Sequence, residues 1–238
     1  MIILLSPTKK QKLVKNRFVD TPLLFDDKKK HVLETAQSLS FEDIKTNFKI
    51  SDNLSQTTLD YYQDYKEHSP AIFTYTGEAF NALSPLTLSD DELKRANNHI
   101  LVFSALYGLV QPFNLISRYR LDLINKFDFN LKNYWTDTIT NYFNTANRPL
   151  INLASDEFSE LIDTNCLSVP LHNIHFLNRK DNVCRVVSAH AKKARGAFAR
   201  ALIQDNFPNL EDIVVEDYIF SHKEDNNYYY IKDFNEIG

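Results

Sequence analysis

Four short apolar runs in this chain each stop abruptly at small or polar residues, and this pattern constrains the fold more than any other feature. The runs, residues 2–5, 100–103, 150–153 and 186–187, continue into Ser6-Pro7-Thr8-Lys9, Ser104-Ala105-Leu106-Tyr107-Gly108, Ala154-Ser155-Asp156-Glu157 and Ser188-Ala189-His190-Ala191-Lys192-Lys193. Continuous apolar runs of this length are typical of strands buried on both faces of a sheet. If the strands are parallel neighbours, their carboxyl ends meet at one edge.

Helical patterns alternate with the strand-like segments along the chain. We expect strands at residues 2–5, 71–75, 100–103, 150–153, 183–187, 213–220 and 228–231. We expect helices at residues 28–39, 41–48, 54–66, 90–97, 135–145 and 189–206. This order predicts an α/β fold, with a mixed sheet flanked by helices.

Residues 41–48 and 54–66 form two helical patterns joined by a tight connection. This outline is that of a helix-hairpin-helix element, with the hairpin at residues 49–54.

The composition favours one soluble domain over residues 1–238. The chain is 43% hydrophobic, has only four glycines and eight prolines, and shows no repeat or linker-like stretch. The opening apolar run is too short for a signal peptide, and no stretch approaches the ~20 apolar residues of a membrane span. Two cysteines make a disulfide scaffold improbable, so we expect a cytoplasmic protein.

The predicted strand ends suggest a polar cleft, because ligands of open α/β sheets bind beyond the carboxyl ends of the strands. Its expected lining combines Ser6, Ser104, Asn152, Ser155 and Ser188 with Lys9, Tyr107, Asp156, Glu157 and Lys192. Asp156, Glu157 and Tyr107 are the candidates for acid–base chemistry. In the alternative interpretation, these serines and acids only cap helices and mark turns.

Residues 187–203 predict a helix with one cationic face. At about 100° per residue, Lys192, Lys193, Arg195 and Arg200 fall within an arc of about 160°, opposite the apolar residues. Gly196 lies in that arc and leaves room for the close approach of a phosphate or a backbone. The cations either bind an anion such as a nucleic acid backbone or form an ordinary solvated face.

Arg118 and Arg120 form a second cationic site. Alternating positions of an extended segment point to one side, so the two arginines are expected to lie together with Tyr119 facing away. Phosphate binding and an internal salt bridge are equally open for this pair.

The common nucleotide-binding, hydrolase and metal-binding signatures are absent from the sequence. We therefore expect no cofactor and no metal. Whether the protein is an enzyme stays open at this point.

Several unusual strings in one order resemble the YaaA family of bacterial peroxide-stress proteins. They are Ser6-Pro7-Thr8-Lys9, Phe73-Thr74-Tyr75-Thr76-Gly77, Leu106-Tyr107-Gly108-Leu109-Val110-Gln111-Pro112, Tyr119-Arg120-Leu121, Trp135, Ile151-Asn152-Leu153-Ala154-Ser155-Asp156-Glu157 and Ala191-Lys192-Lys193-Ala194-Arg195-Gly196. The resemblance runs nearly from end to end.

The resemblance implies a single α/β domain of unusual fold with a helix-hairpin-helix element. It also implies DNA association through a positively charged cleft and a cellular role in keeping unincorporated iron low, which limits peroxide damage to DNA. Carried over by position, the basic residues are Lys9, Lys192, Lys193 and Arg195. This chain departs from the usual pattern because its hairpin has no glycine, and because Thr8 and Gln111 stand where many relatives carry Ala and Arg.

Two hypotheses from different classes follow. In the first, the protein contacts DNA phosphates with low sequence specificity through the basic helix, Lys9, Arg118 and Arg120. In the second, it is an enzyme that acts on a nucleotide or nucleobase in the polar cleft. A third and plainer alternative is a protein whose basic face docks an acidic partner. The oligomeric state is not predicted.

Overall fold

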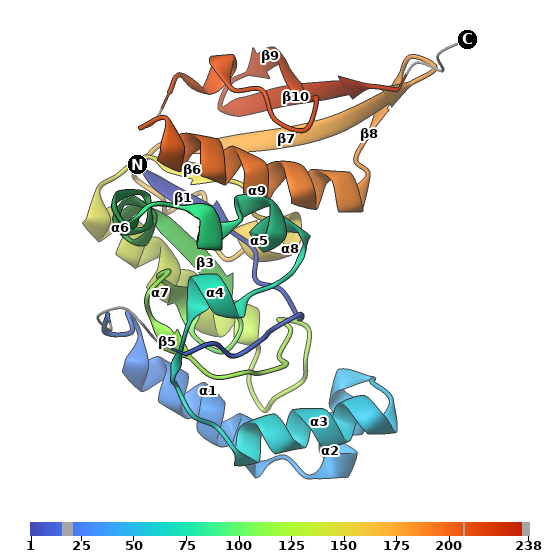
Figure 1. The fold of residues 1–238 in the computed structure, drawn as a ribbon. Coiled ribbons are helices and arrows are strands. Elements are labelled where there is room, and N and C mark those ends of the chain that lie inside the picture. Colours follow the sequence, from blue (N-terminus) through green and yellow to red (C-terminus); the bar gives the residue numbers. More distant parts are fainter. Residues whose placement is uncertain (16–20, 207, 235–238) are drawn as a thin grey trace.

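The fold is built on one mixed sheet, as the computed structural model of residues 1–15, 21–206 and 208–234 shows (Figure 1). Within those residues the sheet has eight strands in the order β4-β3-β1-β6-β7-β10-β9, with β8 paired to β7. The strands are β1 (Ile2–Leu5), β3 (Ile100–Ser104), β4 (Gly108–Val110), β6 (Leu150–Asn152), β7 (Leu171–Lys180), β8 (Val183–Arg185), β9 (Ile219–Glu224) and β10 (Asn227–Asp233). Strands β2 (Ser69–Pro70) and β5 (Leu115–Ile116) form a separate pair.

The centre of the sheet is parallel, as the apolar runs predict. Strand β1 pairs in parallel with β3 on one side and with β6 on the other. Strands β6, β7 and β10 continue the parallel arrangement, whereas β4, β8 and β9 are antiparallel to their neighbours. Three of the four predicted runs therefore bring their carboxyl ends to one edge, and the prediction of an α/β mixed sheet flanked by helices is confirmed.

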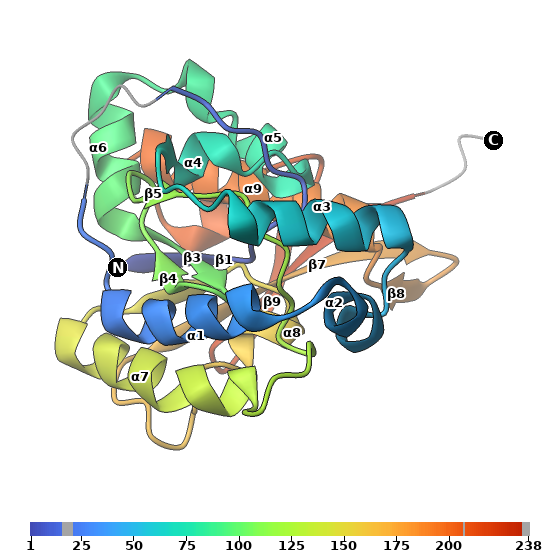
Figure 2. The same cartoon turned by 90° about the horizontal axis from the view of Figure 1, so that it is seen from below.

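Helices cover both faces of the central strands. They are α1 (Asp26–Ser38), α2 (Phe41–Phe48), α3 (Asp52–Gln63), α4 (Ala71–Thr74), α5 (Glu78–Leu83), α6 (Asp90–His99), α7 (Leu131–Ala146), α8 (Asp156–Ser159) and α9 (Ser188–Gln204), with short 3-10 turns at Pro85–Thr87 and Leu210–Asp212. Figure 2 shows α4, α5, α6 and α9 over one face of β1, β3 and β4, and α1 and α7 over the other. Lys28 of α1 contacts α7, because its Nζ donates a hydrogen bond to the Tyr134 carbonyl over 3.0 Å.

Helices α2 and α3 follow one another with a three-residue connection and lie beside α1, far from β9 and β10 (Figure 1). Ser40 begins α2 with a capping box, in which its hydroxyl accepts from the Asp43 amide and the Asp43 carboxylate accepts from the Ser40 amide. Lys49 ends α2 in the left-handed conformation, which explains how a tight connection forms without glycine. The pair of helices is present, and its function as a helix-hairpin-helix element stays a prediction.

Two predicted strands are wrong. Residues 71–74 form helix α4 even though their β-branched and aromatic composition favours a strand, since the Tyr75 amide donates to the Ala71 carbonyl. In the predicted strand 213–220, Glu216 and Asp217 have φ angles of 52° and 64°. Two left-handed residues in sequence break an extended chain, so strand β9 begins only at Ile219.

The longest strand, β7, was not predicted, because polar residues interrupt it. Ile174, Phe176 and Asn178 are buried on one of its faces, whereas Asn173, His175 and Leu177, which alternate with them, are only partly buried. Phe176 packs against Phe198 of α9, with ring centroids 5.8 Å apart. The alternation is that of a strand with one covered face, and its histidines and asparagines conceal it from a search for apolar runs.

None of the helices within residues 1–15, 21–206 and 208–234 has the length and apolar character to cross a bilayer.

Candidate functional site

A cleft of about 500 Å³ lies at the carboxyl edge of the parallel strands, where β1 and β6 end. It is lined by segment 5–11 after β1, the start of α5, segment 119–122, segment 153–158 after β6, and Lys192 and Arg195 of α9. We refer to this hollow as the cleft. It lies where the connections that leave the neighbouring strands β1 and β6 run in opposite directions along the sheet, toward β3 and β7, which is where α/β sheets open a binding crevice.

Hydroxyl groups hold the two strand ends together at the floor of the cleft. The Ser6 and Ser155 Oγ atoms are 3.1 Å apart, and the Ser155 amide donates to Ser6 Oγ over 2.8 Å. The bonds tie the β1 end to the β6 end across 149 positions of sequence. The predicted pairing of Ser6 with Ser155 in one cleft is therefore observed.

Helix α9 contributes the basic wall. Lys192 is exposed, and its side chain has no ion pair within the described residues. Arg195 is only partly exposed, and its Nε atom is buried without a hydrogen-bond partner among the described residues. Burial lowers the pKa of the Arg195 guanidinium, and the nearby Asp156 opposes that shift. The buried Arg195 Nε–H group can therefore donate a hydrogen bond to an acceptor atom of a ligand.

Acidic side chains share the cleft with the cations. Lys9 pairs with Asp122 over 2.6 Å between Nζ and Oδ2. Burial raises the pKa of the Glu157 carboxyl above its usual range, and the Asp122 charge adds to that increase. Lys9 and Lys192 act in the opposite direction on the Glu157 pKa. Glu157 thus has a partly desolvated carboxyl beside two ammonium groups.

The charges of the cleft leave a net positive excess. Five lining residues are cationic, namely Lys9, Lys10, Arg120, Lys192 and Arg195. Three are acidic, namely Glu78, Asp122 and Glu157. The formal excess is two positive charges, whereas the whole chain has a net charge of −4. The cleft therefore concentrates positive charge on a molecule that is acidic overall.

Two of the predicted cleft residues are buried elsewhere. Ser104 is fully buried, and its Oγ accepts from the Leu106 and Tyr107 amides over 3.2 and 3.0 Å. Tyr107 is 1% exposed, and its hydroxyl lies 2.8 Å from that of Tyr65. Burial raises the pKa of the Tyr107 phenol well above its usual value. Both predictions are wrong, because the chain after β3 turns inward rather than opening toward the cleft.

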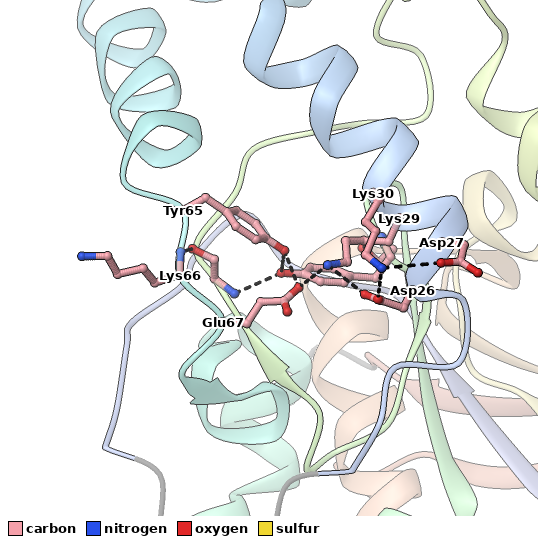
Figure 3. Close-up of polar contacts among 10 residues, drawn as sticks. Asp26, Asp27, Lys29, Lys30, Tyr65, Lys66 and Glu67 are labelled. Atoms are coloured by element: carbon pink, nitrogen blue, oxygen red, sulfur yellow. Dashed lines mark hydrogen bonds and ion pairs between the residues drawn. The ribbon is translucent and has the colours of Figure 1, made fainter.

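Through Tyr65, Tyr107 belongs instead to a polar cluster with Glu67, Lys29 and Asp26, whose contacts Figure 3 shows. Tyr65 donates to Glu67 Oε1 over 2.6 Å, and Glu67 pairs with Lys29 over 2.9 Å. Lys29 is 5% exposed and also pairs with Asp26 over 3.0 Å. A buried ammonium between two carboxylates is satisfied, so this cluster fixes α1 against the segment after α3.

Three predicted cations are occupied away from the cleft. Lys193 pairs with Glu216 over 2.6 Å. The Arg200 guanidinium donates to the Leu83 and Ser84 carbonyls at the end of α5 over 2.8 and 3.0 Å. Arg118 lies over the Tyr61 ring, 4.7 Å from its centroid. The cationic arc of α9 is therefore divided, and Arg118 is separated from Arg120.

The remaining predicted residues lie near the cleft but outside it. Ser188 is exposed at the start of α9, because strand β8 is antiparallel to β7 and ends at Arg185 rather than beside β1. Asn152 and Asp156 line a second cavity on the other side of segment 153–160. Of the proposed acids, only Glu157 lines the cleft.

Sequence reasoning missed several parts of the cleft wall. Gly77, just before α5, packs against the Thr8 side chain after β1. A Cβ at this position would collide with Thr8, so only glycine allows the start of α5 to lie this close to the end of β1. Tyr119, expected to face away from Arg120, lines the cleft with it. No local pattern marks Glu78 or Asp122, although the family-like string that ends at Gly77 pointed to this region.

No three His, Cys, Asp or Glu side chains are grouped as a metal site requires anywhere in the described ranges of the chain. The hydroxyl, ammonium and guanidinium groups of the cleft are instead suited to oxygen atoms of an anionic ligand.

Comparison with known proteins places the chain in a family. A sequence profile described as "Peroxide stress protein YaaA" matches residues 1–224. The chain is 33% identical over 241 residues to a UPF0246 protein of Francisella philomiragia, and the match covers 93% of this chain and 95% of that protein. It is 34% identical over 229 residues to a UPF0246 protein of Marinomonas sp., with 90% and 88% covered. The chain belongs to the YaaA family of peroxide stress proteins.

Proposed function

We propose that this protein binds DNA in the cytoplasm as part of the peroxide stress response, through phosphate contacts in the cleft and with low sequence specificity. The binding accompanies the role that the resemblance implies, which is to keep unincorporated iron low and so limit oxidative damage to DNA. Phosphate contacts position a nucleic acid without reading its bases, so unrelated sequences bind alike.

One observation carries the proposal: basic side chains from three separate segments converge on one cleft. Lys9 and Lys10 follow β1, Arg120 comes from the segment before α7, and Lys192 and Arg195 come from α9. Like charges repel, so their convergence costs free energy unless an anion occupies the space between them. Lys10, Arg120 and Lys192 make no ion pair within the described chain, which leaves them available to phosphate.

A salt-series titration with duplex, single-stranded and junction DNA tests this function. Lys192→Ala is expected to weaken binding to unrelated sequences by a similar factor and to reduce the slope of log K against log salt by about one. Lys193→Ala is the matched control, since it removes the same charge from the next residue, where Glu216 already pairs it. Equal effects of the two variants, or binding that does not respond to salt, would contradict the proposal.

A second candidate function is an enzyme that acts on a nucleotide or nucleobase. The Glu157 carboxyl supports it, because a raised pKa beside Lys192 suits an acid–base group. The volume of about 500 Å³ is also typical of small-molecule sites. Displacement of DNA by a mononucleotide at low concentration, together with loss of turnover in Glu157→Gln, would favour this function.

A further inference from the structure

A second polar cavity of about 720 Å³ lies beside the cleft, and the proposed DNA contacts do not use it. Helix α7, the end of β6, helix α8 and strand β7 form its walls. Segment 153–160 separates the two hollows: Ser155 and Glu157 line the cleft, whereas Ala154 and Asp156 line the second cavity. Arg195 lines both.

The second cavity has the opposite charge to the cleft. Its acidic residues are Asp137, Asp156, Glu160 and Asp163, and its cations are Lys132 and Arg195, a formal excess of two negative charges. Lys132 pairs with Glu160 over 2.6 Å. The Asp137 and Asp156 carboxylates have no hydrogen bond or ion pair with any described residue. Two carboxylates are therefore available to hydrogen-bond donors of a ligand.

A chain of side-chain amides forms another wall. Asn152 Nδ2 donates to Asn173 Oδ1 over 2.9 Å, and Asn173 Nδ2 donates to Asn227 Oδ1 over 3.3 Å. Asn152 Oδ1 also accepts from the Ala154 amide over 3.0 Å. These bonds fix the orientation of the Asn152 and Asn173 amides, and each amide keeps one donor hydrogen unused. Fixed amides with spare capacity are suited to the edge of a nucleobase.

Arg195 connects the two sites. Its buried Nε has no acceptor among the described residues, although the side chain lies between a positive and a negative hollow. A ligand oxygen at this position would satisfy the donor. The ligand that fits is therefore anionic at one end and rich in hydroxyl or amino donors at the other.

We propose that the cleft and the second cavity together hold one nucleotide, with its phosphate beside Lys192 and its sugar and base in the second cavity. The sugar hydroxyls donate to Asp137 and Asp156, as carboxylates receive ribose hydroxyls in other α/β sheets. The Asn152 and Asn173 amides contact the base edge, and Arg195 Nε donates to a ligand oxygen between them. This inference rests on the second candidate function, a nucleotide in the cleft, and it uses the same cleft cations as the proposed DNA contacts.

Calorimetric titration of the full chain with AMP, ribose phosphate and inorganic phosphate tests the proposal. AMP is expected to bind at least about tenfold more tightly than inorganic phosphate, with ribose phosphate between them. Asp137→Asn combined with Asp156→Asn should reduce the ratio of AMP to phosphate affinity by about fivefold or more. Asp128→Asn combined with Asp225→Asn is the control, because it removes the same two negative charges at exposed residues that line neither hollow.

Each outcome decides the proposal. AMP binding no tighter than phosphate in the unaltered protein overturns it. An equal loss of the AMP to phosphate affinity ratio in the Asp128→Asn and Asp225→Asn control also overturns it. Lys192→Ala should weaken all three phosphate compounds by a similar factor, and weakening of AMP alone contradicts the assigned orientation. DNA binding without AMP binding refutes the nucleotide site and leaves the proposed DNA binding intact. AMP binding without DNA binding supports the nucleotide site and refutes the proposed DNA binding.

Discussion

At the scale of single residues, neighbours in sequence have different surroundings. Lys192 and Lys193 differ by about 100° around helix α9, so one lines the cleft and the other meets Glu216. Arg118 and Arg120 diverge in the same way, one over Tyr61 and one into the cleft. A count of cations therefore overstates the positive charge available to a ligand.

Of the described glycines Gly77, Gly108 and Gly196, Gly196 makes the tightest backbone contact, and it lies on helix α9. A Cβ at this position would lie 1.8 Å from the Ala79 carbonyl oxygen of α5, so the two helices would have to separate. Gly196→Ala is expected to lower the free energy of unfolding by about 2 kcal/mol, because overpacking outweighs the better helix propensity of alanine.

Chemical denaturation measures this effect. Ala197→Ser, one residue further along the same helix and partly exposed, should stay within about 0.5 kcal/mol of the unaltered protein. A stabilised Gly196→Ala protein would show that α5 and α9 do not approach as closely as the structure has them.

The Glu157 carboxyl makes stability depend on pH. Its pKa is raised in the folded state from the ordinary 4.5, so the folded protein binds the proton more tightly than the unfolded chain does. Stability should therefore fall as pH rises from below 4.5 through the raised value, and then level off.

Glu157→Gln removes this ionisation, so it is expected to be more stable than the unaltered protein at about pH 7 and to lose that advantage near about pH 4. The effect is small because the carboxyl is partly exposed. Urea unfolding at both pH values measures it. Glu160→Gln, which loses the ion pair with Lys132, should show no such gain, and an equal gain there would contradict the assignment.

At the scale of elements, the consecutive helices α2 and α3 differ in how their N-termini are capped, although a serine precedes both. Both α2 and α3 follow a serine, Ser40 and Ser51, but only the Ser40 hydroxyl accepts a capping hydrogen bond. The Asp43 carboxylate completes that capping box, and its bonds to Ser40 hold the Asp43 pKa below its usual value. Helix α2 therefore depends on its cap more than α3 does.

Ser40→Ala is expected to lower the free energy of unfolding by about 1 kcal/mol, since it leaves a backbone amide of α2 without its acceptor. Ser51→Ala should cost only a few tenths of a kcal/mol, because no such bond is lost. Thermal unfolding of the two variants side by side makes the comparison. Equal losses would show that the Ser40 hydroxyl does not cap the helix in solution.

At the scale of the whole molecule, one sheet extends from β4 to β9, and α9 packs across it against α5, β1 and β7. The single domain over residues 1–238 stays a prediction. Trp135 is the only tryptophan in the sequence; it is fully buried, and its indole N–H donates to the Ala105 carbonyl over 2.9 Å. Its fluorescence therefore reports on packing beneath the β3–β4 end of the sheet.

If residues 1–238 form one cooperative domain, Trp135 fluorescence and far-ultraviolet circular dichroism should give coincident urea unfolding curves. The helices that dominate the dichroism lie on both faces of the sheet, whereas the fluorescence reports on one place. Separate midpoints would instead divide the chain into units that unfold independently.

Much of the fold could be predicted from local patterns. The apolar runs predicted the parallel centre of the sheet, and the helical patterns at residues 41–48 and 90–97 placed helices α2 and α6. Strand β7 and the helical turn at Ala71–Thr74 could not be predicted, because tertiary contacts override the propensities of their residues. Of the predicted cleft residues, Ser6, Lys9, Ser155, Glu157 and Lys192 line the cleft. Arg195 of the predicted cationic face lines it too, and so does Arg120, which was expected in a second site with Arg118.

The class of fold, the strand ends that meet near β1 and the family can all be read from the amino-acid sequence, because they depend on patterns along the chain. Which polar groups remain available to a ligand depends instead on how the chain packs. Ser104 and Tyr107 turn into the core, Lys193 finds Glu216, and Arg195 lies between two hollows of opposite charge. Such pairings join residues far apart in sequence, and they depend on side-chain positions that only the packed chain establishes.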